Sequence, residues 1–211
     1  MLNKEELLKN VAIILVYVTL IVIAITPIAL ARSFESDIYD QWNTLSEFED
    51  TYRLRNFLIE KDWIYDDISL KDIDYILVLT EQCSKEFFPN VPTSLVLAII
   101  SVESGFNKDL IGFNKDTGLM QIIEKWHKER IKKYMYDENV DLCDPRLNIM
   151  VGMDYLEELL EKGKGDVEFA VMAYNMGAER AWESYGKGRL SSYAKQVLYC
   201  MNEIEDILGR R

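Results

Sequence analysis

The feature that most constrains this chain is an uncharged apolar run close to its N-terminus. Residues 11–31 read VAIILVYVTLIVIAITPIALA and contain no charged side chain. About 20 apolar residues in a helix span the roughly 30 Å hydrocarbon core of a bilayer, so this run predicts a transmembrane helix. Its length favours an uncleaved signal anchor over a signal peptide. Because Ala29-Leu30-Ala31 resembles a signal-peptidase site, secretion after cleavage near Ala31 stays open as the alternative.

The charges around the apolar run predict its orientation. Lys4 and Lys9 precede the run, whereas Arg32 is followed within a few residues by Glu35 and Asp37. Positively charged flanks stay on the cytoplasmic side of a membrane. We therefore expect a cytoplasmic leader over residues 1–10, a single membrane span, and the rest of the chain on the extracytoplasmic side.

Net charge and cysteine spacing exclude other classes of function. The chain has 24 Lys and Arg against 36 Asp and Glu, a net charge of −12, and such a surface repels the phosphates of nucleic acid. Cys83, Cys143, Cys200 and the single His127 lie far apart and lack the paired spacing of zinc ligands. We expect no nucleic-acid partner, no metal and no organic cofactor.

Beyond the apolar run, the hydrophobic pattern is helical throughout. Aromatic and aliphatic residues recur every three or four positions over residues 32–68, which predicts a helical juxtamembrane stem. Residues 69–208 predict an all-α domain with little or no sheet, because no stretch alternates as a strand would. Side chains that can cap its helices are Ser69, Thr93 or Ser94, Asp144 and Asp166.

Glu103 is the candidate catalytic residue. It ends an apolar stretch, SLVLAIISVES, that predicts a central core helix, and a loop rich in Gly, Asn and Asp follows it. A carboxyl group desolvated at such a helix end has a raised pKa and can act as a general acid near neutral pH. The local pattern alone fits equally well an acidic residue that only ends a helix.

Five separated motifs resemble those of the lytic transglycosylases of the soluble type, a lysozyme-like and mostly helical family. They occur in the family's order, and Gln121 follows Glu103 by the eighteen residues that the family uses. The motifs are Glu103-Ser104 with Phe106, Gly118-Leu119-Met120-Gln121, the Asp144-Pro145 segment through Leu156, Ala173-Tyr174-Asn175-Met176-Gly177, and Tyr193-Ala194 with Val197.

The resemblance implies cleavage of the β-1,4 bond between N-acetylmuramic acid and N-acetylglucosamine in peptidoglycan, with a 1,6-anhydro-muramyl end as product. Glu103 would act as both acid and base. Glycan-binding roles are implied for Ser104, Met120, Gln121, Tyr174, Asn175 and Tyr193. The expected partner is the peptidoglycan glycan strand. Any partner in envelope machinery, and the setting (wall turnover, a secretion or conjugation apparatus, a phage), stays open.

Two positions depart from the family pattern. Gly112 stands where the family usually has a serine near the reacting sugar, and Lys115-Asp116 replaces its usual Gly-Ala. An added carboxylate at Asp116 could activate water, so hydrolysis, as in goose-type lysozymes, is the alternative reaction. A glycan-binding scaffold without turnover is the third alternative, and the presence of Glu103 argues against it.

Overall fold

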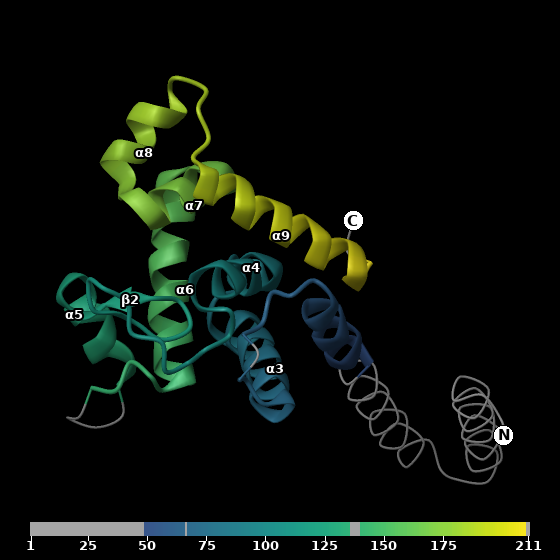
Figure 1. The fold of residues 1–211 in the computed structure, drawn as a ribbon. Coiled ribbons are helices and arrows are strands. Elements are labelled where there is room, and N and C mark those ends of the chain that lie inside the picture. The colour runs from purple at the N-terminus through teal and green to yellow at the C-terminus, as the bar shows by residue number, and fades with distance from the viewer. Residues whose placement is uncertain (1–48, 66, 136–139, 210–211) are drawn as a thin grey trace, which may run out of the picture. The chain divides into compact units, whose positions relative to one another are not determined.

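The computed structural model describes residues 49–65, 67–135 and 140–209, and the chain divides into two units at Glu49. The predicted leader and membrane span at residues 1–31 lie outside the described residues. Within the described part, no helix is long and apolar enough to cross a membrane. The second unit, Asp50–Arg211, is a helical body with one small hairpin (Figure 1).

The unit begins earlier than the domain start expected at residue 69. Residues 49–60 form a helix, and its Leu54 and Leu58 are buried in the core of the unit. The described part of the predicted stem thus packs on the domain through its apolar face. The apolar residues of a separate stem helix and those of a helix packed on the domain recur with the same spacing. Sequence periodicity alone therefore could not distinguish the two.

Helix α4 (Thr93–Ser104) is the centre of the fold. Eight of its twelve residues, Thr93 to Ile100, are consecutively buried, which agrees with the prediction of a core helix. It packs against α3 (Leu70–Phe87) on one side and α9 (Ser192–Leu208) on another. Its N-cap is Pro92 and not Thr93 or Ser94, because both of those side chains lie inside the helix and are buried.

Helix α6 (Pro145–Lys162) forms a second support for the core. It contacts α3, α5 (Glu124–Tyr134) and α7 (Val167–Met176), and it stands upright in Figure 1. Asp144 caps it by accepting from Leu147 N, and Asp166 caps α7 by accepting from Phe169 N, both as predicted. At Gly177, with φ of 83°, the chain turns from α7 into α8 (Ala178–Tyr185).

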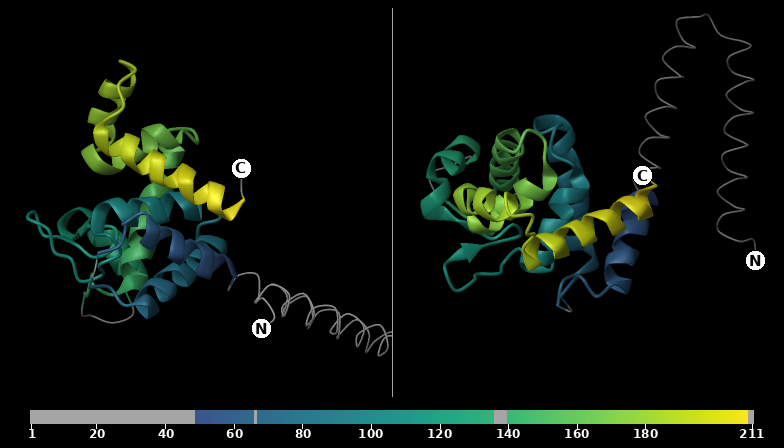
Figure 2. Two further views of the ribbon diagram at one scale, coloured as in Figure 1. Left: turned by 45° about the vertical axis from the view of Figure 1, so that its right-hand side comes forward. Right: turned by 90° about the horizontal axis from the view of Figure 1, so that it is seen from above.

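A two-stranded antiparallel hairpin lies between α4 and α5. Strand β1 (Asp116–Thr117) pairs with β2 (Ile122–Ile123), with Asp116 opposite Ile123. The four residues between them are Gly118 to Gln121, so the hairpin turn is the Gly118-Leu119-Met120-Gln121 motif identified in the sequence. The loop before β1 stands out from the body in both views of Figure 2.

Candidate active site

Glu103 lies in the last turn of α4, where the helix leaves the core. The helix ends at Gly105, whose φ of 53° is left-handed and is readily adopted by glycine. The pKa of Glu103 is raised to about 6: burial is the main cause, the nearby Asp116 charge adds to it, and a hydrogen bond from Tyr193 opposes it. A carboxyl group with that pKa is protonated in a useful fraction of molecules near neutral pH, as a general acid requires.

Tyr193 is brought to Glu103 by the packing of α9 on α4. Ser191 caps α9 by accepting from Ala194 N, which fixes Tyr193 in the first turn of the helix. The Tyr193 hydroxyl then donates to Glu103 Oε1 at 2.6 Å. Burial and the adjacent Glu103 charge raise the pKa of Tyr193 well above its usual range, so the hydroxyl keeps its proton.

Tyr174 approaches the same place from α7. Its hydroxyl donates to the backbone oxygen of Met120 at 2.8 Å and thereby ties α7 to the hairpin turn. Burial, the Glu103 charge and Tyr155 raise the pKa of Tyr174 well above its usual range. The structure therefore brings Glu103, Tyr174 and Tyr193 together, each from a different helix.

Gln121 holds the hairpin turn together. Its φ is 48°, and its Nε2 donates to Gly118 O at 2.8 Å and to Leu110 O at 3.2 Å. These contacts use the amide nitrogen for the protein's own backbone. A glycan contact by Gln121 is therefore restricted to its amide oxygen.

Two of the expected substrate contacts, Ser104 and Met120, lie beneath the site. Both are fully buried. Ser104 Oγ donates to Leu119 O at 2.8 Å, and Met120 packs so closely on Gly152 that a Cβ there would lie 2.3 Å from its sulfur. Both side chains are turned into the protein, where they position the backbone around Glu103. A direct contact of either residue with the glycan stays a prediction.

Asn175 is placed differently from the two tyrosines. It is exposed next to the C-terminal end of α7. Among the described residues, no hydrogen bond ties its amide to Glu103, Tyr174 or Tyr193. Its side chain is open to solvent, and its role in glycan binding stays a prediction.

Asn148 is a site-building residue that sequence reasoning did not assign. It is fully buried on α6, and its Oδ1 accepts from Met120 N at 2.8 Å. Its Nδ2 donates to Thr117 O and Leu142 O, both at 2.8 Å. The sequence did contain a signal for Asn148, because it is the asparagine of the Asp-Pro-x-x-Asn-Ile motif. A motif does not indicate, however, which backbone groups the asparagine side chain binds.

The loop between Glu103 and the hairpin is closed by Asp116. The Asp116 carboxylate occupies the space next to Gly112, where a Cβ would lie 1.9 Å from Asp116 Oδ2. The glycine at this position and the carboxylate four residues later therefore form one unit, and a serine at 112 would require the carboxylate to move. Elsewhere in the described residues, no group of His, Cys, Asp or Glu side chains is arranged to hold a metal ion.

Comparison with known protein families decides the family of the chain. Residues 84–196 match the sequence model of the transglycosylase SLT domain, a range that includes the three residues gathered around the site. The chain belongs to the transglycosylase SLT family. It is an enzyme of the lytic transglycosylase type, and the resemblance seen in the motifs is confirmed.

Curated relatives agree with this assignment. Protein IpgF of Shigella flexneri is 38% identical to this transglycosylase over 125 residues, which cover 57% of this chain and 72% of IpgF. Invasion protein IagB of Salmonella typhimurium is 34% identical over 122 residues, covering 50% of this chain and 74% of IagB. The soluble lytic murein transglycosylase of Escherichia coli is 29% identical over 109 residues, 49% of this chain and 17% of that longer protein.

Solved structures show the same fold. The transglycosylase aligns with lytic transglycosylase Slt of Pseudomonas aeruginosa at a TM-score of 0.55 and 23% identity, covering 63% of this chain and 24% of that one. The 70 kDa soluble lytic transglycosylase of Escherichia coli aligns at a TM-score of 0.54 and 21% identity, covering 77% and 31%. The expectation of a mostly helical, lysozyme-like domain is confirmed.

Proposed function

We propose that this transglycosylase cleaves the β-1,4 bond between N-acetylmuramic acid and N-acetylglucosamine in peptidoglycan and leaves a 1,6-anhydro-muramyl end. The observation that carries the proposal is the state of Glu103. Its pKa is raised to about 6 by burial, and the Tyr193 hydroxyl donates to it at 2.6 Å. One carboxyl group with an intermediate pKa suits a reaction in which the same group first gives a proton and then takes one.

The reaction needs one protein carboxyl group because the substrate supplies the nucleophiles. Protonated Glu103 gives its proton to the glycosidic oxygen as the C–O bond breaks, while the muramic acid's 2-acetamido oxygen attacks the anomeric carbon. The ionised Glu103 then takes the proton of the 6-hydroxyl, whose oxygen displaces the acetamido oxygen and closes the anhydro ring. No water is consumed, and the intramolecular attack gains from proximity.

The two tyrosines have different roles around Glu103. The Tyr193 hydroxyl donates to the carboxylate that remains after the first step, and a hydrogen bond to a charged acceptor is stronger than one to a neutral acceptor. Tyr174 donates to Met120 O and holds the hairpin turn against α7. Tyr193 therefore acts on the reacting group, and Tyr174 on the shape of its surroundings.

Hydrolysis of the same bond is the second candidate, and Asp116 is the observation that favours it. Its charge is close enough to Glu103 to raise the pKa of that group. A second carboxylate near the acid is the arrangement that lets a glycosidase activate water. The products distinguish the two reactions, since hydrolysis leaves a reducing muramic acid end.

We further propose that the enzyme works next to a membrane, with residues 11–31 as a single-pass anchor and the catalytic unit on the cell-wall side. The support is the uncharged apolar run and the charges that flank it. One relative, from Buchnera aphidicola, is called membrane-bound lytic murein transglycosylase E and is 27% identical over 117 residues, 50% of this chain and 55% of that protein. Cleavage near Ala31 would instead release the same unit.

Digestion of purified peptidoglycan tests the proposed reaction. We expect mass spectrometry to find 1,6-anhydro-muramyl ends with the wild-type chain and none with Glu103→Gln, which keeps the shape and removes the proton. Reducing ends alone would establish the hydrolase. Retained binding to cell walls without any cleavage would establish the scaffold.

A further inference from the structure

The loop between α4 and β1 carries an aromatic side chain that the chemistry above does not use. Phe113 is 101% exposed, more than any other large hydrophobic residue that the structure describes, and Ile111 beside it is 64% exposed. Single exposed apolar residues are ordinary on protein surfaces. Exposure alone therefore does not identify Phe113 as a binding residue.

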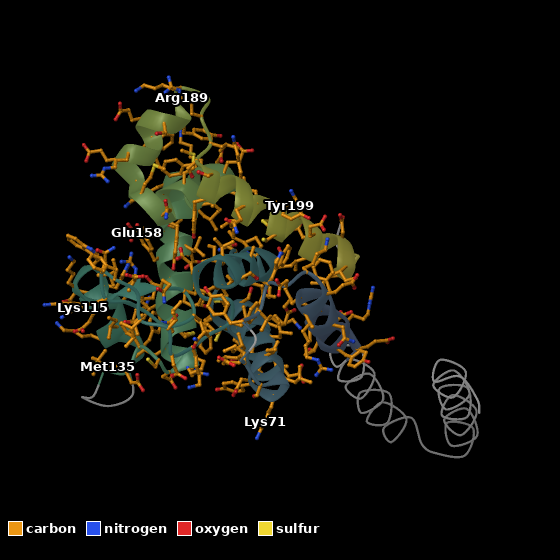
Figure 3. The ribbon with its side chains drawn as sticks, viewed as in Figure 1. Lys71, Lys115, Met135, Glu158, Arg189 and Tyr199 are labelled. Carbon is orange, nitrogen blue, oxygen red and sulfur yellow. The ribbon has the colours of Figure 1, made fainter. Side chains whose placement is uncertain are left out.

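The loop is built as a tight turn with Phe113 near its apex. Gly112 N donates to Asp116 O at 2.8 Å, Lys115 N donates to Gly112 O at 3.1 Å, and Asn114 N donates to Asp116 Oδ1 at 3.0 Å. The backbone around Phe113 is thus held on both sides. Figure 3 shows Lys115, two residues further on, at the outer edge of the molecule.

The base of the same loop is shared with the active site. The loop leaves α4 after Ser104, the residue next to Glu103, and its closing residue Asp116 contributes to the raised pKa of Glu103. Leu110 O accepts from both Gly118 N at 2.8 Å and Gln121 Nε2 at 3.2 Å, which joins the loop to the hairpin turn. A ligand at Glu103 therefore lies beside a loop whose conformation is already fixed.

We propose that Phe113 is a substrate-binding residue whose ring stacks on a pyranose of the glycan strand cleaved at Glu103; this inference rests on the proposed function. A pyranose presents C–H groups on its faces, and the face of an aromatic ring carries the partial negative charge that such groups favour. Because the loop is ordered before binding, the ring adds contact area at little cost in conformational entropy.

Size and charge favour a sugar over other occupants. A specific protein partner buries roughly 800 Å² on each side, far more than one phenylalanine and a neighbouring isoleucine supply. An anionic lipid surface attracts basic segments, whereas this loop is neutral, with Lys108 and Lys115 against Asp109 and Asp116, and the chain has a net charge of −12. A neutral sugar ring matches the area of one aromatic face and needs no countercharge.

Steady-state kinetics of the full chain on purified glycan strands test the inference. We expect Phe113→Ala to raise KM about fivefold, the effect of losing roughly half the burial of one aromatic side chain, with kcat unchanged. Phe113→Trp should restore the wild-type KM, because it keeps a flat ring. The matched control is Tyr75→Ala, which removes a 52% exposed aromatic from α3 and should leave KM unchanged.

The outcomes separate this inference from the proposed function. A wild-type chain that releases no cleaved product contradicts the proposed function, and the inference with it. An active chain whose KM is the same in Phe113→Ala overturns the inference alone, as does a lower kcat with an unchanged KM. Photolysis of a Phe113→benzoylphenylalanine variant with cell walls should give a glycan adduct, and an adduct with protein or lipid only would also overturn it.

Discussion

The Tyr193 hydroxyl and the Glu103 carboxyl group, 90 residues apart in the chain, are joined by a hydrogen bond of 2.6 Å. The bond lowers the pKa of Glu103, whereas burial, the larger effect, raises it. The pKa of about 6 is therefore a balance between a helix end that excludes water and a tyrosine that stabilises the ionised form. The hydrogen bond from Tyr193 and the charge of Asp116, which also raises the pKa, can each be removed by one substitution.

Removing the Tyr193 hydroxyl tests the hydrogen bond that lowers the pKa of Glu103. In Tyr193→Phe the pKa of Glu103 should rise, so the alkaline limb of the kcat/KM profile should move to higher pH. The rate at the optimum should fall about tenfold to a hundredfold, because the carboxylate loses a hydrogen bond to a charged acceptor. Tyr199→Phe, on the exposed face of α9, is the control and should change neither. An unshifted limb in Tyr193→Phe would contradict the assignment.

Removing the Asp116 charge tests the repulsion that raises the pKa of Glu103. Asp116 raises the pKa of Glu103 by charge repulsion, so Asp116→Asn should lower that pKa and move the alkaline limb of kcat/KM to lower pH. The shift is thus opposite in sign to that of Tyr193→Phe. Asp109→Asn removes an exposed carboxylate from the same loop and should leave the profile in place. If the Asp116→Asn limb does not move, the two groups are not coupled.

The Asp116→Asn variant also bears on the choice between the two reactions. If Asp116 activates water, any reducing muramic acid ends among the products should disappear while anhydro ends persist. We expect anhydro ends from both the wild type and the variant, because the proposed route consumes no water. Mass spectrometry of the digests reads both product classes in one measurement.

The raised pKa of Glu103 also has a consequence for stability. Its folded-state value of about 6 lies above the ordinary 4.5, so the folded protein binds this proton more tightly than the unfolded chain. The resulting penalty is absent below pH 4.5, grows as pH rises, and is complete above pH 6, where it reaches up to about 2 kcal/mol. Glu103→Gln should therefore raise the free energy of unfolding at pH 7.5 but not at pH 4.

Urea unfolding at the two pH values provides the measurement. The natural comparison is Glu179→Gln, an exposed acidic residue on α8, which should change stability little at either pH. A Glu103→Gln variant that is equally stabilised at pH 4 and pH 7.5 would place the effect in packing and not in the charge.

Much of the fold was predictable from the sequence because its signals are local. The caps at Ser69, Asp144 and Asp166 and the apolar run of α4 depend only on neighbouring residues, and each was found where predicted. Glu103 became a candidate in the same way, from an apolar helix that ends in a carboxyl group, but its catalytic role was predicted only from the five motifs in the family's order.

The remaining features depend on residues distant in sequence. Whether Met120 faces a glycan or the core is decided by Gly152 on α6, which leaves room for its sulfur and covers it. The Ser104 side chain likewise turns inward, because its hydroxyl donates a hydrogen bond to Leu119 O. A motif letter records that a residue type is needed at a position, but it does not record which way the side chain points.

Asn148 gives the last prediction, because one buried amide joins three segments around the hairpin. Asn148→Ala leaves Met120 N, Thr117 O and Leu142 O without their partner, and each buried unsatisfied group costs about 1–3 kcal/mol. We expect urea unfolding to show a loss of at least about 3 kcal/mol. Thr80→Val is the control and should cost far less, because its buried hydroxyl donates only to Ile76 O within its own helix. Equal losses in the two variants would mean that the Asn148 amide does not hold the turn.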